Sequence, residues 1–152
     1  MKEGRGRSGM LEHEKLSGEI IAAAIAVHRN LGPGFLKAVY ENALCVELHA
    51  RNVRLQRQLI VPVFYRGSEV GAHRLDLVVD ERMVVELKAI KTVETIHFAV
   101  VRSYLTAIGL EHGLILNFAR LTLEIKHVRR LSSDTIPVFL PSSEIMPPES
   151  KI

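Results

Sequence analysis

The chain has 152 residues, of which 47% are hydrophobic and 24% are charged, and its formal net charge is +3. A chain of this length forms one domain that can bury roughly 68–70% of its unfolded surface, and its mild basic charge permits a phosphate-rich partner without requiring one. Its longest apolar run, Ile20–Val27, is far shorter than a membrane span, and the single cysteine, Cys45, excludes an internal disulfide and fits a cytoplasmic protein.

The chain divides into a basic, glycine-rich arm over residues 1–10, one domain over 11–131, and a proline- and serine-rich tail over 132–152. Their composition predicts a flexible arm and an extended or irregular tail. Apolar residues at helical spacing predict a first helix over Leu11–Asn30. A Gly-Pro-Gly turn would end it, and the same spacing predicts a second helix over Leu36–Arg51.

A strand is predicted over Leu55–Tyr65, and Pro62 within it favours an edge position or a bulge because proline cannot donate a ladder hydrogen bond. A turn over residues 66–68 then leads toward a β-hairpin over Arg74–Lys88. The strands of this hairpin are apolar on both faces, which is typical of central strands covered by helices on both sides.

After the hairpin, helical spacing predicts a third helix over Thr92–Ile108, with Glu94 near its start and Gly109 just past its end. Two short strands follow, over Gly113–Phe118 and Leu121–Val128. This order, α-α-β-β-β-α-β-β, predicts an α/β (α+β) fold in which a mixed central sheet is flanked by helices.

The hairpin brings two acidic residues together. If its loop is Asp80–Arg82, then Val79 pairs with Met83, and Asp76 lies directly across from Glu86. Both carboxylates would then lie on one face of two adjacent strands in the protein interior. Buried charges cost several kcal/mol per ion unless they are paired or bound to a metal, so the pair needs an explanation.

Two interpretations of this pair remain open. The side-chain period of two puts Arg74 and Lys88 on the same face, so the four charges could form structural ion pairs, Arg74 with Asp76 and Lys88 with Glu86. Alternatively, the two carboxylates form a site for Mg²⁺ or Mn²⁺, which prefer hard oxygen ligands. Lys88 would then assist the attacking water or the scissile phosphate in phosphodiester cleavage.

Three stretches, over residues 18–44, 74–88 and 96–118, closely resemble the GxxExxY proteins, a compact branch of the PD-(D/E)XK nuclease superfamily. The resemblance extends over roughly Leu11–Leu131. It implies a PD-(D/E)XK nuclease-like fold, with a mixed sheet of about four strands between helices. It also implies a hydrolase that uses Mg²⁺ or Mn²⁺ to cleave DNA or RNA.

The resemblance assigns roles to the hairpin residues. Asp76 and Glu86 match the metal-binding acids, and Lys88 matches the lysine of the (D/E)XK motif. These three are the candidate catalytic residues. Arg74, on the same face, is a candidate supporting residue.

The name motif of the family is incomplete in this chain. Gly34 and Tyr40 occupy its glycine and tyrosine positions, but Lys37 stands where the family has a metal-binding glutamate. Glu41 lies about one helical turn further on and could substitute only if the helix rotated. We expect Lys37 to project toward the Asp76–Glu86 pair, where its ammonium would neutralise one of the two carboxylates and stand in for the cation.

The third helix departs from the family pattern as well. Tyr104 is present, but Val100 stands where related proteins carry a glutamine four residues earlier. His97 shares a helical face with Tyr104 and could reach the site as a supporting group, although a hydrogen-bonded structural role is more common for such a histidine.

Two hypotheses of different classes follow. The first is a metal-dependent nuclease with a partly degraded active site. The second is a catalytically inactive PD-(D/E)XK domain that serves as an oligomeric, structural or nucleic-acid-binding module. The second draws on the third helix, which is apolar on most of its faces and would lie deep in the core or in a homo-oligomer interface.

Overall fold

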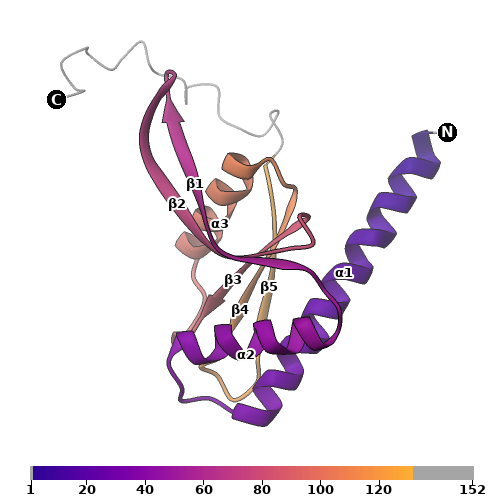
Figure 1. Ribbon diagram of the computed structural model, residues 1–152, viewed down its shortest axis with the longest axis vertical. Helices are drawn as coiled ribbons and strands as arrows, with labels where there is room; N and C mark the ends of the chain where they lie inside the picture. The colour runs from indigo at the N-terminus through magenta and orange to yellow at the C-terminus, as the bar shows by residue number, and fades with distance from the viewer. Residues whose placement is uncertain (1, 132–152) are drawn as a thin grey trace.

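The computed structural model describes residues 2–131, so the predicted tail over 132–152 lies outside the described residues. The order of elements is the predicted one (Figure 1). The helices and strands are α1 (Lys2–Leu31), α2 (Lys37–Ala50), β1 (Leu55–Tyr65), β2 (Ser68–Val79), β3 (Met83–Lys88), α3 (Thr95–Ile108), β4 (His112–Asn117) and β5 (Glu124–Arg129).

The strands form one mixed sheet in the order β1-β2-β3-β4-β5. All neighbours are antiparallel except β3 and β4, which are parallel and are connected through α3. The predicted fold class is therefore confirmed, with five strands rather than about four. The estimate of about four came from the family resemblance, whereas the predicted element order already contained the fifth strand, which begins at Glu124 rather than Leu121 and pairs along the full length of β4.

Strand β1 lies at the edge of the sheet, as Pro62 predicts, and its register with β2 shifts between Val63 and Phe64, next to the proline. Beyond the central sheet, β1 and β2 continue as a protruding two-stranded arm (Figure 1). The first helix begins at Lys2, so it includes residues 2–10 of the stretch that was predicted to be a flexible arm. Extending an existing helix costs far less than nucleating one, which favours this continuation.

Helices cover both faces of the sheet. One cluster of buried side chains joins α1 and α2 to Leu77 and Val85, and a second joins α3 to Val78 and Val84. This alternation confirms that the hairpin strands are apolar on both faces. Leu75 is buried, as expected, but it packs on the α3 side rather than with Leu77, because β2 leaves its regular pairing with β3 at this point.

The third helix begins at Thr95, three residues later than predicted. Glu94 and His97 form a capping box, in which the glutamate side chain accepts a hydrogen bond from the backbone N–H of His97 and the histidine ring accepts one from that of Glu94. Gly109 ends the helix in a left-handed conformation, as expected. Within the part of the chain that is described, no helix is long and apolar enough to cross a membrane.

Candidate metal centre

The hairpin has the predicted register. Val79 pairs with Met83 and Leu77 pairs with Val85 around a three-residue turn. The regular ladder ends there, and the next position along the same register sets Asp76 opposite Glu86. The Asp76 carboxylate replaces the missing ladder acceptor, since its Oδ2 accepts a hydrogen bond from the backbone N–H of Leu87 at 3.0 Å.

Both acids are buried, with relative exposures of 4% for Asp76 and 5% for Glu86. Burial raises the pKa of Glu86 to about 7, together with the negative charge of Asp76. A hydrogen bond from the protonated Glu86 to Asp76 acts in the same direction, whereas the charges of Lys88 and Lys37 lower the pKa. Lys88 Nζ lies 3.4 Å from Glu86 Oε2. Among the described residues, the other oxygen, Glu86 Oε1, is buried and has no hydrogen-bond donor. The ionised pair therefore lacks a full set of cationic or hydrogen-bonding partners.

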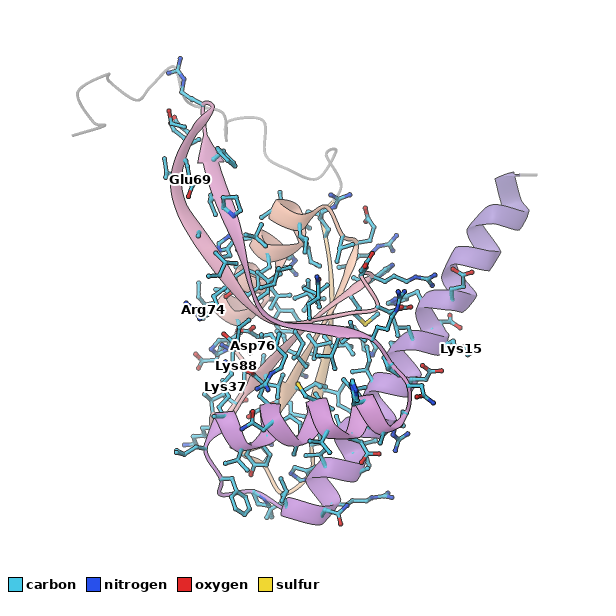
Figure 2. The ribbon with its side chains drawn as sticks, viewed as in Figure 1. Lys15, Lys37, Glu69, Arg74, Asp76 and Lys88 are labelled. Atoms are coloured by element: carbon cyan, nitrogen blue, oxygen red, sulfur yellow. The ribbon has the colours of Figure 1, made fainter. Side chains whose placement is uncertain are left out.

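Lys37 approaches the pair from the first residue of α2, as expected (Figure 2). Its Nζ lies 2.9 Å from Asp76 Oδ2 and 3.0 Å from Oδ1. The Lys37 side chain is 42% exposed, compared with 6% for Asp76, so the ammonium covers the carboxylate from the solvent side. Burial by itself lowers the pKa of Lys37, but the hydrogen bond and charge of Asp76, with Glu86 and Glu41, raise it overall.

The ion pairs only partly match the structural interpretation of the hairpin. Glu86 pairs with Lys88, as that interpretation expected. Asp76 pairs with Lys37, whereas Arg74 is exposed and makes no ion pair with Asp76 in the described structure. A cation at the start of a helix is disfavoured by the helix dipole, so the buried carboxylate of Asp76 is what stabilises Lys37 in this position.

Glu41 lies on the side of α2 that faces β1 and is linked to Asp76 through a neighbouring amide group. Its side chain is buried, and its Oε2 lies 3.0 Å from Arg57 Nη2. The amide nitrogen of Gln58 lies 3.1 Å and 3.0 Å from the two Glu41 oxygens and 3.4 Å from Asp76 Oδ1. One amide group thus connects Glu41 to the metal-binding acid.

Gln58 and Arg57 are the site residues that the sequence analysis missed. Both lie in β1, which contributes nothing to the family motif. A usable signal was the short predicted turn over residues 66–68, which would pair the strand over Leu55–Tyr65 with the strand that follows it; in the structure this pairing places Gln58 opposite Asp76. The register of these two strands could not be deduced from their apolar pattern alone.

Tyr40 bonds the backbone of the turn before α2 and makes no hydrogen bond to Asp76 or Glu86 in the described structure. It is fully buried and stacks on Phe118 with ring centroids 4.6 Å apart. Its hydroxyl donates a hydrogen bond to Gly32 O at 2.6 Å and accepts one from Phe35 N at 3.1 Å. Tyr40 therefore holds the turn that precedes Lys37.

The two candidate residues of α3 differ in their roles. The half-buried ring of Tyr104 meets the ring of His73 edge-on, with centroids 4.8 Å apart. Burial, followed by the charges of Glu86 and Asp76, raises the pKa of Tyr104, which places its hydroxyl in the field of the acidic pair. His97 caps its own helix at Glu94, so it is a hydrogen-bonded structural histidine.

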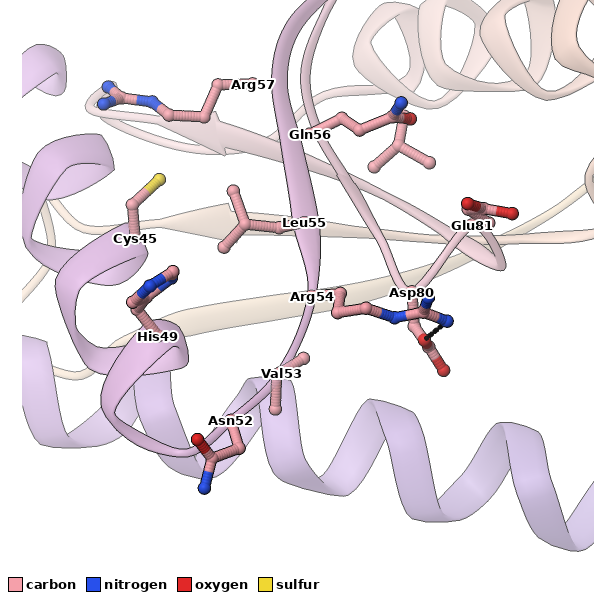
Figure 3. Close-up of a pocket in the computed structure, with 11 residues that line it drawn as sticks. Cys45, His49, Asn52, Val53, Arg54, Leu55, Gln56, Arg57, Asp80 and Glu81 are labelled. Atoms are coloured by element: carbon pink, nitrogen blue, oxygen red, sulfur yellow. Dashed lines mark hydrogen bonds and ion pairs between the residues drawn. The ribbon is translucent and has the colours of Figure 1, made fainter.

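A groove of about 790 Å³ lies between α2 and the start of β1, and neither Asp76 nor Glu86 lines it (Figure 3). Arg57 lines it and links it to Glu41. Cys45 also lines the groove, and burial raises the pKa of its thiol, which disfavours the reactive thiolate. The groove is therefore connected to the acidic site only through the ion pair of Arg57 with Glu41.

The acidic pair fits a divalent cation. Mg²⁺ is commonly held by one or two carboxylates together with substrate oxygens and water. Asp76 and Glu86 supply hard oxygen ligands, and Glu86 Oε1 has no competing donor. Within the described residues, no three His, Cys, Asp or Glu side chains are already gathered as a metal cluster. The ammonium of Lys37 contacts Asp76 where such a cation would bind.

The family model of the PD-(D/E)XK nuclease superfamily matches residues 14–131. Among solved structures, the crystal structure of SSO0001 is similar, with a TM-score of 0.51 and 15% sequence identity over 72% of this chain and 57% of that one. At this identity the likeness concerns the fold alone, and the chain spans little more than half the length of SSO0001. No curated protein matches the chain. Because the matched family model covers the whole sheet and every residue of the acidic site, the chain belongs to the PD-(D/E)XK nuclease superfamily.

Proposed function

We propose that the protein is a divalent-metal-dependent, nuclease-like phosphodiesterase whose metal site is closed by Lys37. The observation that carries this proposal is the buried Asp76–Glu86 pair, in which one oxygen of Glu86 has no donor. Such an arrangement is costly for a purely structural site, because both acids lose their hydration. In a nuclease it leaves a ligand position for Mg²⁺ or Mn²⁺.

The residues of the site have distinct roles in this proposal. Asp76 and Glu86 would hold the cation, which supplies Lewis-acid stabilisation of a phosphate when it is bound. Lys88 is about one quarter exposed and lies beside Glu86, so its ammonium can face both the acids and an incoming phosphodiester. There it would stabilise negative charge that develops on the phosphate and help orient the attacking water.

The substrate would be DNA or RNA, and the single cysteine is compatible with action in the cytoplasm. Within the superfamily we assign the chain to the GxxExxY branch, on the spacing of Gly34 and Tyr40 around position 37. The presence of lysine at that position replaces a ligand charge with a repelling one. The wild-type protein is therefore expected to bind Mg²⁺ and Mn²⁺ weakly.

Calorimetric titration with Mn²⁺ tests the proposal. Lys37→Glu should bind Mn²⁺ at least tenfold more tightly than the wild type, and adding Asp76→Asn should abolish the gain. Lys15→Glu is a matched control, because it makes the same charge change on α1 away from the site (Figure 2). Tight binding by the wild type, or no gain in Lys37→Glu, would show that Lys37 does not close the site.

The alternative function is an inactive domain that associates with a second copy through α3. It is favoured by the exposure of Ile96, which is 61% exposed on this helix. Sedimentation of the wild type and of Ile96→Glu over a range of concentrations distinguishes the two. A dimer that dissociates in Ile96→Glu, together with no Mn²⁺ binding in Lys37→Glu, would support the inactive domain.

A further inference from the structure

A second groove, of about 510 Å³, lies between α3 and the two-stranded arm of β1 and β2 (Figure 1). Apolar side chains line it from the arm, from α3 and from the end of the described chain, among them Val63, Phe64, Ala107 and Leu131. Phe64 is 60% exposed and Leu131 is 47% exposed. Exposed apolar side chains gathered around a hollow are typical of a surface that binds a chain segment.

The groove also contains a cation without a counter-charge. Arg102 lines it, and the Nε of this arginine is buried and has no hydrogen-bond partner among the described residues. Its guanidinium lies over the ring of Phe98, 5.8 Å from the ring centroid. Among residues 2–131, no acidic side chain lines the groove. A buried donor without an acceptor is costly, so a chain segment that brings an acid to Arg102 would be stabilised there.

The segment that follows Leu131 has the chemistry that this groove lacks. The described part of the chain ends at Leu131, which itself lines the groove. Asp134 comes three residues later, and the run Ile136–Leu140 is apolar. Three residues of extended chain span roughly 10 Å, so Asp134 is within reach of the groove. Pro137 within the run disfavours a helix and suits an extended segment that lies along a groove.

We propose that residues 134–140 bind in the groove of their own chain, with Asp134 paired to Arg102 and the apolar run packed between Phe64 and α3. The connection from Leu131 is short, so closing the loop costs little entropy and the effective concentration of the segment is high. The contact is independent of the metal centre, because neither Asp76 nor Glu86 lines the groove.

The competing occupant is a second copy of the chain. In a symmetric dimer the same patch faces itself, so a second copy would bring another Arg102 to the groove and no acid from its lining. The segment after Leu131 brings both an acid and an apolar run. Binding within one chain is also independent of protein concentration, whereas binding of a second copy is not.

The experiment measures how fast a thiol in the groove reacts with a chromogenic disulfide reagent in the full-length protein. Thr106 is an exposed residue of α3 that lines the groove, and Thr106→Cys in a Cys45→Ser background supplies the thiol. Adding Ile136→Ser and Phe139→Ser should speed the reaction by about fivefold or more, because the segment no longer covers the thiol. Val46→Cys, at an exposed position of α2, should react at the same rate with and without these two changes.

A matched control removes apolar side chains outside the proposed segment. Ile145→Ser together with Met146→Ser makes a similar loss further along the chain and should leave the rate at Thr106→Cys unchanged. Equal rates with all three sequences after residue 131 would overturn the inference. Protection of the thiol that increases with protein concentration would also overturn it and would assign the groove to a second copy.

Charge reversal tests the pairing of Asp134 with Arg102. Asp134→Arg should speed the reaction at Thr106→Cys, and adding Arg102→Glu should restore the slow rate. No acceleration in Asp134→Arg would overturn the pairing, as would a failure of the double reversal to restore protection in a protein that melts normally. If Arg102→Glu does not fold, Arg102→Gln should speed the reaction by itself and make it insensitive to Asp134→Arg, and an unchanged rate would contradict the role of Arg102.

Discussion

Lys37 Nζ contacts both carboxylate oxygens of Asp76, at 2.9 Å and 3.0 Å, so a single ammonium covers a buried acid of the candidate site. The lysine side chain is partly exposed to water and the aspartate is buried. The ammonium can therefore move into solvent without repacking the core. The state of the site depends on which cation Asp76 holds, and this dependence can be measured through stability as well as through binding.

Replacing Lys37 with methionine should lower the free energy of unfolding at pH 7. The change leaves the buried Asp76 carboxylate without its cation. Removal of one partner of a fully buried pair costs 3–5 kcal/mol, and because Lys37 is partly exposed we expect a smaller loss of about 1–2 kcal/mol. Urea denaturation measures it. Excess Mn²⁺ should restore part of the loss in Lys37→Met and should scarcely affect the wild type; equal effects of Mn²⁺ on both would contradict the prediction.

Gln58→Gly should be more stable than Gln58→Ala. Both changes remove the amide that bonds Glu41 and Asp76, so the difference between them isolates the backbone. Glycine adopts the φ of +50° without the side-chain penalty, which for other residues is roughly 1–2 kcal/mol. Urea denaturation of the two variants should show a difference of about 1 kcal/mol in favour of glycine. Alanine equal to or better than glycine would show that position 58 is not strained.

Tyr40→Phe should destabilise the fold by about 1–2 kcal/mol, because it removes two part-buried hydrogen bonds, the one that the Tyr40 hydroxyl donates to Gly32 O and the one that it accepts from Phe35 N. The stacking of ring 40 on Phe118 is retained in this variant. Tyr65→Phe makes the same chemical change at the more exposed end of β1 and should cost less than 0.5 kcal/mol, which is about the usual effect of a surface substitution. Thermal melts of both variants test the difference, and equal shifts would argue against a positioning role for the Tyr40 hydroxyl.

The contribution of His13 and His112 to stability should fall as the pH drops below about 6.5, the ordinary histidine pKa in the unfolded chain, whereas Glu86, whose pKa is raised to about 7, acts in the opposite direction over this range. His13 and His112 stack with ring centroids 3.5 Å apart. Burial is the main cause that lowers the pKa of each ring. The charge of His127 adds to it at His13, and the charge of His13 adds to it at His112. Arg129 lowers both pKa values as well. At these two rings the unfolded chain therefore binds protons at a higher pH than the folded protein does, so their contribution to stability is complete above about 6.5 and is lost as the pH falls toward the lowered values.

Glu14 near His13 and Glu111 near His112 act in the opposite direction and moderate this effect. The His13→Phe variant keeps an aromatic ring in the stack but removes one titrating group and one cause of the shift at His112. Urea denaturation from pH 7.5 to pH 5 should therefore show a smaller loss of stability in His13→Phe than in the wild type. An unchanged pH dependence would mean that other groups dominate the acid response.

The features that the sequence predicted well are those determined by local chemistry. The hairpin register follows from its three-residue loop and the two-residue period of its side chains, so the Asp76–Glu86 pair could be deduced before the fold was known. Pro62 predicted the edge position of β1 because it lacks a donor, and Gly109 predicted the end of α3. The position of Lys37 against Asp76 was expected only through the family resemblance.

The features that depended on tertiary structure arise from contacts between distant segments. Leu75 packs on the α3 side because β2 leaves its pairing with β3 at Asp76, and no local pattern encodes that departure. Glu41 faces the acids because α2 packs against the sheet in a particular rotation. Gln58 reaches both acids only because its backbone takes a left-handed conformation that local propensity disfavours.

The sequence by itself thus determined the order of the elements, the two-sided burial of the hairpin and the acidic pair, because each depends on spacing along a single segment. Only the tertiary structure decided that Lys37 pairs with Asp76 and that the Gln58 amide lies between Glu41 and Asp76. These contacts join side chains of α2, β1 and β2. Their geometry depends on how the helix packs against the two strands, and that packing overrides the local conformational preference of each segment.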